Sequence, residues 1–335
     1  MRALVFAEKE RPVVKEVPRP EPGEGEVLVR MEVAGVCATD YHLLKGGHLA
    51  RFPLIPGHEL VGRVEALGPK VAGLRVGERV AVHPVVACGA CVYCRKGLPQ
   101  HCLHFQALGV TLNGGFAEYL VAPAKNLYPV GDLPPERAVF AEPLGCVLWG
   151  LVRLGPILGE EALVFGAGPI GLLLLQGLLL AGATRVYAVD PVAERRDLAR
   201  ALGAAEALSP QDLPALREAH PLGFGVVAEA TGRPEVVEAM PSFARRGGRI
   251  LIFGVHPEEA KAALSPYEIY ARDLSVIGSF SLPDNLAEAL AYLREGRVRV
   301  EPLVSEVVPL EALPDHFQNR LQGRGLDRIK TLVRL

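Results

Sequence analysis

The segment from Ala162 to Asp190 is the feature that most narrows the fold of this chain. It begins with a short apolar run, passes through a glycine-rich turn and an apolar stretch, and closes with a second apolar run that ends in an acidic residue. The turn carries three glycines in the spacing G-x-G-x-x-G. Strand, glycine turn, helix and strand in this order predict a parallel, doubly wound α/β sheet that binds a dinucleotide.

The three glycines have separate physical roles in such a turn. Gly166 permits the tight bend, Gly168 lets backbone amides approach a pyrophosphate, and Gly171 allows the helix to pack closely. A helix N-terminus attracts negative charge, which favours phosphate at this point. Ile170, at the start of the helix, is also predicted to border the cofactor.

The acidic residue at the end of the second run bears on which dinucleotide is bound. The carboxylate of Asp190 accepts ribose hydroxyls and would repel a 2'-phosphate, so NAD is expected rather than NADP. Arg195 complicates this expectation, because a guanidinium can hold either an adenine face or a phosphate. Arg196 fits a solvent-exposed helix face at least as well as a cofactor contact.

Four of the six cysteines stand in one short segment. Cys88, Cys91, Cys94 and Cys102 follow the spacing C-x2-C-x2-C-x7-C. In a chain that keeps its thiols reduced, such a cluster favours a metal over disulfides. Four thiolates close all positions around a tetrahedral ion, so we expect a structural zinc lobe over residues 83 to 104, approximately. The alternative is a chance cluster of reduced surface cysteines.

A second set of metal-binding side chains is more dispersed. Cys37, His58, Glu59 and Glu142 offer one thiolate, one imidazole and two carboxylates. Zinc that keeps an open position for chemistry is held by a mixture of this kind. Each residue alone is more often an ordinary core or surface group, so the prediction of a catalytic zinc site depends on the combination.

Length and charge restrict the remaining classes of protein. A chain of 335 residues predicts two domains, and a net charge of -2 disfavours nucleic acid as a partner. The N-terminus does not read as a signal peptide, and the longest apolar segment, residues 170 to 180, is too short to cross a membrane. A cytoplasmic enzyme or binding protein is therefore expected.

Three motifs together resemble those of one family. The run Gly57-His58-Glu59-x2-Gly62-x5-Gly68, the spacing of the clustered cysteines and the glycine turn are similar to the zinc-containing alcohol dehydrogenases of the medium-chain dehydrogenase superfamily. The resemblance implies a GroES-like β catalytic domain of residues 1–145 and 282–335 around an inserted Rossmann domain of residues 146–281. It also implies two zinc ions per chain and a homotetramer or homodimer.

The resemblance assigns further residues to the site. A proton relay is implied from the substrate hydroxyl through Thr39 and the cofactor ribose to His42. Asp40 is expected to orient His58, or else to cap a helix that begins near Tyr41. Loops after the later strands would meet the nicotinamide end of the cofactor, with the candidates Phe253, Gly254, Val255, Ser279 and Phe280. Thr39, His42 and the loop residues also fit ordinary turn, surface or core positions.

Glu142 stands where many members of the family place a second cysteine ligand. This departure resembles the polyol and threonine dehydrogenase branch, in which Glu142 would bind zinc directly or through water. As an alternative, the carboxylate caps a helix ahead of Pro143.

The expected reaction is hydride transfer from a secondary alcohol or small polyol to NAD, giving a ketone. Leu43, Ser281 and Leu282 stand where relatives resembling sorbitol dehydrogenase carry tyrosine or arginine, which favours a less hydroxylated substrate than sorbitol. L-Threonine 3-dehydrogenase is the alternative within the family. A non-catalytic, NAD-sensing zinc protein is the alternative of another class, while zinc-free quinone reductases lack both metal patterns.

Overall fold

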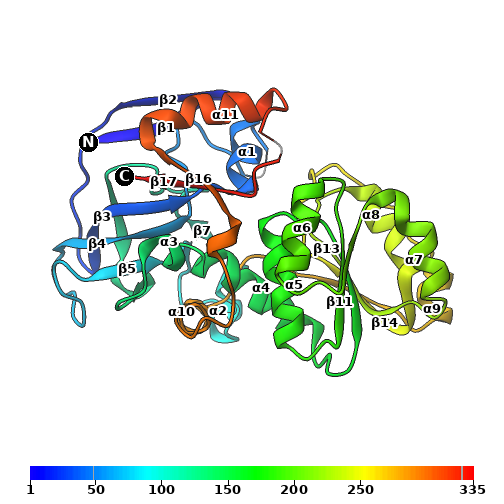
Figure 1. Cartoon of the computed structure of the whole chain (residues 1–335). Helices are drawn as coiled ribbons and strands as arrows, with labels where there is room; N and C mark the ends of the chain where they lie inside the picture. Colours follow the sequence, from blue (N-terminus) through cyan, green and yellow to red (C-terminus); the bar gives the residue numbers. More distant parts are fainter. Residues whose placement is uncertain (48, 326) are drawn as a thin grey trace. The chain divides into compact units, whose positions relative to one another are not determined.

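The computed structural model describes residues 1–47, 49–325 and 327–335, and it divides into two compact units (Figure 1). The first unit comprises Met1–Gly145, Leu282–Gly296 and Val300–Leu335. The second comprises Cys146–Ser281 and Arg297–Arg299.

Residues 297–299 belong to the second unit, whereas the sequence led us to expect them in the first. The side-chain amide of Gln176 donates to the carbonyl oxygen of Arg299 at 3.1 Å and accepts the Arg299 N–H at 2.8 Å. Gln176 is buried on α5 (Pro169–Leu180) of the second unit. These two hydrogen bonds hold the segment there, and hydropathy gave no sign of them.

The first unit is built on a seven-stranded sheet in the order β16-β17-β3-β4-β5-β9, with β8 also paired to β3. All pairs are antiparallel except β16 with β17. The strands are β3 (Glu26–Gly35), β4 (Glu59–Leu67), β5 (Arg79–Val82), β8 (Tyr119–Pro123), β9 (Leu127–Pro129), β16 (Val304–Pro309) and β17 (Lys330–Arg334). Two further pairs are β1 (Arg2–Glu8) with β2 (Arg11–Glu16), and β6 (Val85–Val86) with β7 (Gln106–Ala107).

The core of the first unit follows from the alternation of apolar residues along β3. Val27, Val29 and Met31 are buried and lie two residues apart, so their side chains share one face of the strand. They belong to a cluster that also contains Phe116 and Phe317. Removing this apolar surface from water is the main stabilising contribution of the sheet.

The helices of the first unit include one that lies near the C-terminus of the chain. They are α1 (Ala38–Leu44), α2 (Val92–Arg95), α3 (Pro135–Ala138), α10 (Leu286–Arg294) and α11 (Leu313–Leu321), while α4 (Ala141–Leu154) begins in the first unit and ends in the second. Phe317 of α11 packs edge-on against Phe6 of β1, with ring centroids 5.2 Å apart. The tail of the chain forms the strand β16, the helix α11 and the strand β17 (Figure 1).

The second unit contains a six-stranded parallel sheet in the order β12-β11-β10-β13-β14-β15. Its strands are β10 (Glu161–Phe165), β11 (Arg185–Val189), β12 (Glu206–Leu208), β13 (Phe224–Glu229), β14 (Ala244–Ile252) and β15 (Ser275–Gly278). Besides α5, its helices are α6 (Ala193–Ala201), α7 (Leu213–Ala219), α8 (Pro234–Ala239) and α9 (Pro266–Ala271). Figure 1 shows helices on both faces of this sheet, which confirms the predicted doubly wound α/β fold.

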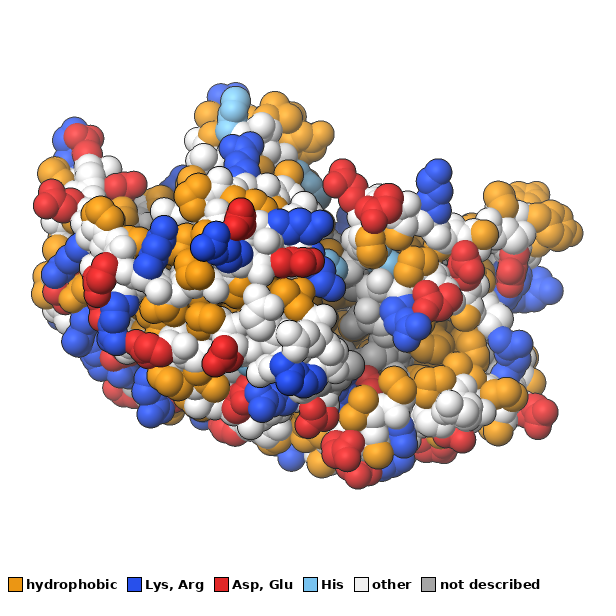
Figure 2. Space-filling model, turned by 90° about the horizontal axis from the view of Figure 1, so that it is seen from above, with side chains coloured by type: hydrophobic (Ala, Val, Ile, Leu, Met, Phe, Trp, Pro, Cys, Tyr) orange, Lys and Arg blue, Asp and Glu red, His pale blue; other side chains and the backbone are white. Residues whose placement is uncertain are grey.

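The surface carries charges of both signs. On the face shown in Figure 2, Lys and Arg side chains are interspersed with Asp and Glu side chains. Within the described ranges, no helix combines the length and the apolar character that crossing a membrane requires.

Candidate metal centres and nucleotide site

Three of the predicted ligands converge at one end of the first unit's sheet. One atom each of Cys37, His58 and Glu59 lies within 4.8 Å of the other two. The cause is the pairing of β3 with β4, which sets Gly35 opposite Glu59. Cys37 follows the end of β3 and His58 precedes the start of β4, so antiparallel pairing makes neighbours of residues distant in sequence.

The position of Cys37 is fixed by the start of α1. Cys37 is the N-cap residue, and its N–H donates to Asp40 Oδ2 at 2.9 Å. Its Sγ donates to Thr39 Oγ1 at 3.6 Å. The helix therefore begins at Ala38, and the expected start near Tyr41 is wrong, because the Asp40 carboxylate stabilises the first turn from its third position.

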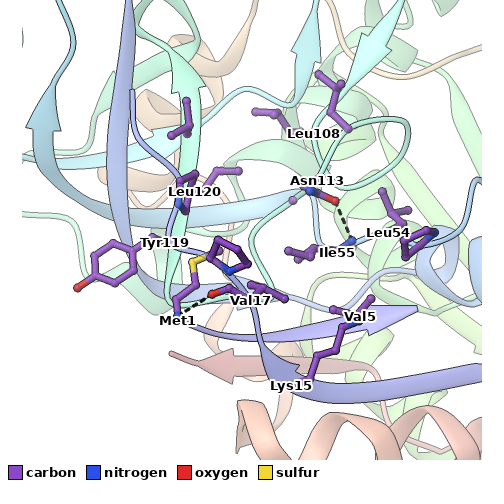
Figure 3. Close-up of a pocket in the computed structure, with 16 residues that line it drawn as sticks. Met1, Val5, Lys15, Val17, Leu54, Ile55, Leu108, Asn113, Tyr119 and Leu120 are labelled. Atoms are coloured by element: carbon purple, nitrogen blue, oxygen red, sulfur yellow. Dashed lines mark hydrogen bonds between the residues drawn. The ribbon is translucent and has the colours of Figure 1, made fainter. Parts of the chain in front are cut away.

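Two loops, residues 54–57 and 113–116, form hydrogen bonds with each other and hold the segment that leads to His58. Gly57 has a φ of +93°, and a Cβ there would lie 2.8 Å from the Phe116 ring. Gly115 N–H donates to the Gly57 carbonyl at 3.0 Å. On the other side, Asn113 Oδ1 accepts the Ile55 N–H at 3.1 Å (Figure 3). The residue before His58 must therefore be glycine, and the histidine is held firmly in place.

The same two loops border an apolar cavity of about 440 Å³ (Figure 3). Lys15 and the side chain of Asn113 supply polar groups to a wall that is otherwise mostly apolar, with Val5, Leu54 and Leu120 among its residues. The cavity lies in the first unit.

His58 is buried beside the side chain expected to orient it. Its Nδ1 lies 3.6 Å from Asp40 Oδ1, longer than a hydrogen bond, and neither atom has a hydrogen-bond partner within the described part of the chain. Burial disfavours the charged imidazole, but the neighbouring Cys37 thiolate and Asp40 carboxylate outweigh it and raise the pKa of His58 well above its usual value. Asp40 is thus near enough to orient His58 after a small adjustment.

The structure adds a residue that the sequence did not reveal. Lys330, at the start of β17, forms an ion pair with Glu59, and both side chains are only 2 % exposed. Its Nζ also donates to the carbonyl oxygen of Val36 at 3.0 Å. Burial lowers the pKa of Lys330, but Glu59 and then Cys37 more than offset this and raise it above its usual value. The sequence of the final strand did not mark this lysine as buried, because the strand also carries Thr331 and Arg334.

Glu142 lies in the first turn of α4 and is buried. Within the described residues, the group that lies within 4.8 Å comprises Cys37, His58 and Glu59 without it. The charge of Glu142 contributes to the raised pKa of Lys330, so the carboxylate acts on the same cluster from a longer distance. Its role as a direct or a water-mediated ligand stays a prediction.

The four clustered cysteines also converge. Their sulfur atoms lie within 4.8 Å of one another, with Cys91 Sγ 3.5 Å from Cys94 Sγ and 3.9 Å from Cys102 Sγ. A tetrahedron of sulfurs at 2.3 Å from zinc has edges of about 3.8 Å. Backbone N–H groups of Cys94 and Leu103 lower the pKa of Cys91 to about 6, which favours the thiolate. The geometry and the donor set therefore fit zinc.

The glycine turn of the second unit has the geometry that its spacing predicts. Gly166 has a φ of +94°, and its N–H donates to the Val189 carbonyl at 2.8 Å. A Cβ on Gly171 would lie 1.8 Å from the Gly166 oxygen, whereas one on Gly168 would meet no atom within 4 Å. Gly171 is therefore required by packing and Gly168 faces open space. Ile170 lies half-buried in the first turn of α5.

Asp190 lies at the carboxyl end of β11, beside the glycine turn. Its Oδ2 accepts the Ala167 N–H at 2.8 Å and its Oδ1 accepts the Val192 N–H at 2.9 Å. Arg195 lies close by, with Nη1 3.8 Å from Asp190 Oδ2. Arg196 instead donates to the carbonyl oxygen of Asp190 at 2.8 Å. The interpretation of Arg196 as part of a solvent-exposed helix face did not predict this structural contact.

The remaining cofactor candidates lie after β14 and β15, at the same edge of the sheet. Phe253 and Gly254 are half-buried, and the Phe253 ring packs against Gly150 of α4. Val255 and Phe280 are exposed, and Ser279 is half-buried. Carboxyl ends of parallel strands meet at one edge, which is where ligands of such sheets bind.

The ion pair of Lys330 with Glu59 can be tested through stability. Lys330→Met should lower the free energy of unfolding by about 3–5 kcal/mol, because it leaves a buried carboxylate without its partner. Adding Glu59→Gln should recover part of the loss. Urea unfolding measures both, and Lys70→Met, which breaks the exposed pair with Glu24, is the control. A Lys330→Met variant as stable as the control would contradict the assignment.

The glycine turn can be tested with two matched variants. Gly168→Ala should fold normally but bind NADH at least about tenfold more weakly, because the added methyl occupies the space through which a pyrophosphate approaches. Gly171→Ala should also lose stability, since its Cβ would overlap the Gly166 oxygen. Thermal unfolding and fluorescence titration measure the two effects. Unchanged NADH binding by Gly168→Ala would exclude this role for the turn.

Two family models match this chain. An alcohol dehydrogenase GroES-like domain matches residues 23–132, and a zinc-binding dehydrogenase domain matches residues 169–295. Together they cover most of the chain and fall in the order that the sequence motifs predict.

Three curated relatives match over most of their own length. D-altritol 5-dehydrogenase of Agrobacterium fabrum is 40 % identical, with 96 % of each chain covered. D-arabinitol dehydrogenase 1 of Uromyces fabae is 39 % identical over 85 % of this chain and 84 % of its own. L-threonine 3-dehydrogenase of Stenotrophomonas maltophilia is 37 % identical over 78 % and 79 %, respectively.

Solved structures show the same architecture. A protein of Sinorhizobium meliloti 1021 described as a zinc-binding dehydrogenase, bound to NADP, superimposes with a TM-score of 0.95 at 32 % identity, covering 100 % of this chain and 99 % of the other. An alcohol dehydrogenase of Escherichia coli CFT073 complexed with NADH gives 0.93 at 28 % identity with the same coverage. By its motifs, fold and relatives, the chain belongs to the zinc-containing alcohol dehydrogenase family of the medium-chain dehydrogenase superfamily.

Proposed function

We propose that this protein transfers hydride between a secondary alcohol or small polyol and NAD, with a catalytic zinc held by Cys37, His58 and Glu59. The observation that carries the proposal is the convergence of one thiolate, one imidazole and one carboxylate within 4.8 Å, in a chain that also contains a dinucleotide-binding sheet. This donor set suits zinc with an open position, whereas the Cys88 to Cys102 lobe offers four sulfurs and would be closed.

When bound, zinc would polarise the substrate oxygen and NAD would accept the hydride. The chain's own residues hold the ligands and move the proton. Asp40 accepts a hydrogen bond from the backbone N–H of Cys37 through Oδ2, and its Oδ1 lies near His58 Nδ1. Lys330 balances the charge of Glu59 and limits its freedom to leave the site.

The proton released from the substrate hydroxyl needs a route to solvent. Thr39 and His42 lie three residues apart on α1, so their side chains share one side of the helix. A hydroxyl both accepts and donates a proton, and an imidazole titrates near neutral pH. We assign the first transfer to Thr39 and the release to His42, which would act once the cofactor is bound.

The substrate class is supported by the relatives rather than by the residues singled out in the sequence. Two of the relatives are named as polyol dehydrogenases and match at 39 % and 40 % identity. Leu43 and Leu282 are fully buried, so their apolar character extends the core and carries little weight for the polarity of the substrate. A polyol oxidised at a secondary hydroxyl is the first candidate.

L-Threonine is the second candidate substrate, because a threonine dehydrogenase is among the relatives at 37 % identity. A panel of alditols, simple secondary alcohols and L-threonine, followed by NADH formation, separates the two. Turnover of L-threonine far above every polyol and alcohol would reverse their order. NADH binding by the zinc-loaded protein without turnover of the panel would favour a non-catalytic, NAD-sensing role.

NAD is proposed as the preferred cofactor because of the carboxylate at the end of β11. Asp190→Asn removes the negative charge while keeping one oxygen to accept a backbone N–H. We expect kcat/KM with NADP, relative to NAD, to rise by about tenfold or more. The control is Asp197→Asn, which neutralises an exposed carboxylate on α6. A ratio that stays at the wild-type value in both variants would refute the role of Asp190.

Zinc content tests the two metal centres separately. The wild type should hold about two zinc ions per chain, and Cys37→Ser should hold about one, lose turnover and stay folded. Cys91→Ser should lose the other ion and unfold at lower temperature, because a structural zinc contributes to folding. Metal analysis, turnover and thermal unfolding give the three readouts. Full zinc content in Cys37→Ser would refute the ligand assignment.

Location and assembly are proposed on the family resemblance alone. A cytoplasmic homotetramer, or a homodimer, stays a prediction that sedimentation of the purified protein and cell fractionation can test.

A further inference from the structure

A fully buried carboxylate at the carboxyl end of β13 has no part in the proposed chemistry. Glu229 is 0 % exposed, yet it lies outside both groups of candidate metal ligands. We propose that Glu229 is a positioning residue that fixes the two loops receiving the nicotinamide half of the dinucleotide. This inference rests on the proposed use of NAD.

One oxygen of the carboxylate organises the loop that follows β13. Glu229 Oε2 accepts the Thr231 N–H at 2.9 Å, the Thr231 hydroxyl at 3.1 Å and the Gly232 N–H at 3.1 Å. Three donors from two consecutive residues converge on a single charged acceptor. Hydrogen bonds to a charged acceptor are stronger than those between neutral groups, so the loop has little freedom.

The other oxygen reaches the loop that follows β14. Glu229 Oε1 accepts the Gly254 N–H at 2.9 Å. The backbone carbonyl of Glu229 also accepts the N–H groups of Phe253 and Gly254, each at 3.2 Å. One residue therefore ties together both loops through its side chain and its main chain.

The two loops lie so close together that neither Gly232 nor Gly254 has room for a side chain. A Cβ on Gly254 would lie 2.4 Å from the Gly232 nitrogen and 2.8 Å from Glu229 Oε2. Gly232 has a φ of +67°, and a Cβ there would lie 2.4 Å from the Val255 oxygen. His256 completes the surroundings, with Nδ1 bonded to the Gly254 carbonyl at 3.0 Å and Nε2 3.8 Å from Glu229 Oε1.

The order of the strands shows which part of the dinucleotide these loops would meet. Asp190 ends β11 on one side of β10, and β13 with β14 lie on the other side. With the pyrophosphate at the glycine turn and the adenosine ribose at Asp190, the second half of an extended dinucleotide must run over the ends of β13 and β14. A Cβ on Gly166 would lie 3.1 Å from the Ala230 oxygen, so the loop after β13 adjoins the turn.

A role in folding alone accounts poorly for this residue. Burying an ionised carboxylate has a large desolvation cost, and apolar side chains of similar volume often serve stability as well or better. The donors of Glu229 are loop N–H groups at the ligand-binding edge of the sheet, where fixed backbone geometry favours binding because less ordering is needed.

The test compares two ligands that share the adenosine half. Zinc-loaded, full-length Glu229→Ala should bind NADH about tenfold or more weakly, because several hydrogen bonds to a charged acceptor are lost. ADP, which lacks both the nicotinamide and its ribose, should bind within about twofold of wild type, since its contacts lie at the glycine turn and Asp190. Calorimetry measures both dissociation constants in the same preparations.

Glu229→Gln provides the second variant if the alanine variant folds poorly. Its amide keeps one acceptor oxygen but turns an N–H₂ group toward N–H donors, so NADH binding should weaken by an intermediate factor while ADP binding stays unchanged. Glu235→Gln, which neutralises an exposed carboxylate at the start of α8, is the matched control and should leave both ligands unaffected.

Three results would overturn the inference or its premise. Equal weakening of NADH and ADP would mean that Glu229 supports the unit as a whole and does not position the nicotinamide loops. Unchanged binding of both ligands in both Glu229 variants would also refute the inference. Wild-type protein that binds neither ligand would instead refute the proposed function.

Discussion

The pairing of β3 with β4 is the constraint on which the candidate catalytic centre depends. Gly35 faces Glu59 across the ladder, and a Cβ on Gly35 would lie 2.0 Å from Glu59 Oε2. The register therefore needs a glycine at this point. A shift by one residue would turn Glu59 toward the opposite face of the sheet and separate Cys37 from His58. The chemistry of the site is thus set by backbone pairing before any metal binds.

Two buried carboxylates are stabilised in different ways, and the difference suits their roles. Glu59 is balanced by a buried ion pair of its Oε2 with Lys330, whose Nζ also donates to the Val36 carbonyl. Glu229 is surrounded by backbone N–H groups and one hydroxyl, so moving it would disturb two loops at once. An ion pair leaves a carboxylate able to take part in metal binding, whereas a set of backbone hydrogen bonds holds it still.

The sequence predicted well those features whose parts lie close together along the chain. The glycine turn spans six residues and the cysteine lobe fifteen, so spacing alone reports their geometry. Cys37 and His58 were predicted from their combined donor types, and the resemblance supported them, but only the pairing of two strands brings them together. Lys330 was missed, since its partner lies in a strand near the other end of the chain. The start of α1 was misplaced because Asp40 acts from inside the helix.

Glu229 carried a signal of the same kind as Asp190, namely an apolar run that ends in an acidic residue. Both side chains are buried at carboxyl ends of parallel strands on either side of β10, and both accept backbone N–H groups of their own following loop and of a neighbouring loop. In a parallel sheet, the loops that follow the strands meet at one edge. Backbone N–H groups of these loops lie close together there, and a carboxylate can accept hydrogen bonds from several of them. The acid at the end of each strand then holds the loop in a single conformation. Loops held in this way need less ordering when a ligand binds, which favours binding on both sides of the glycine turn.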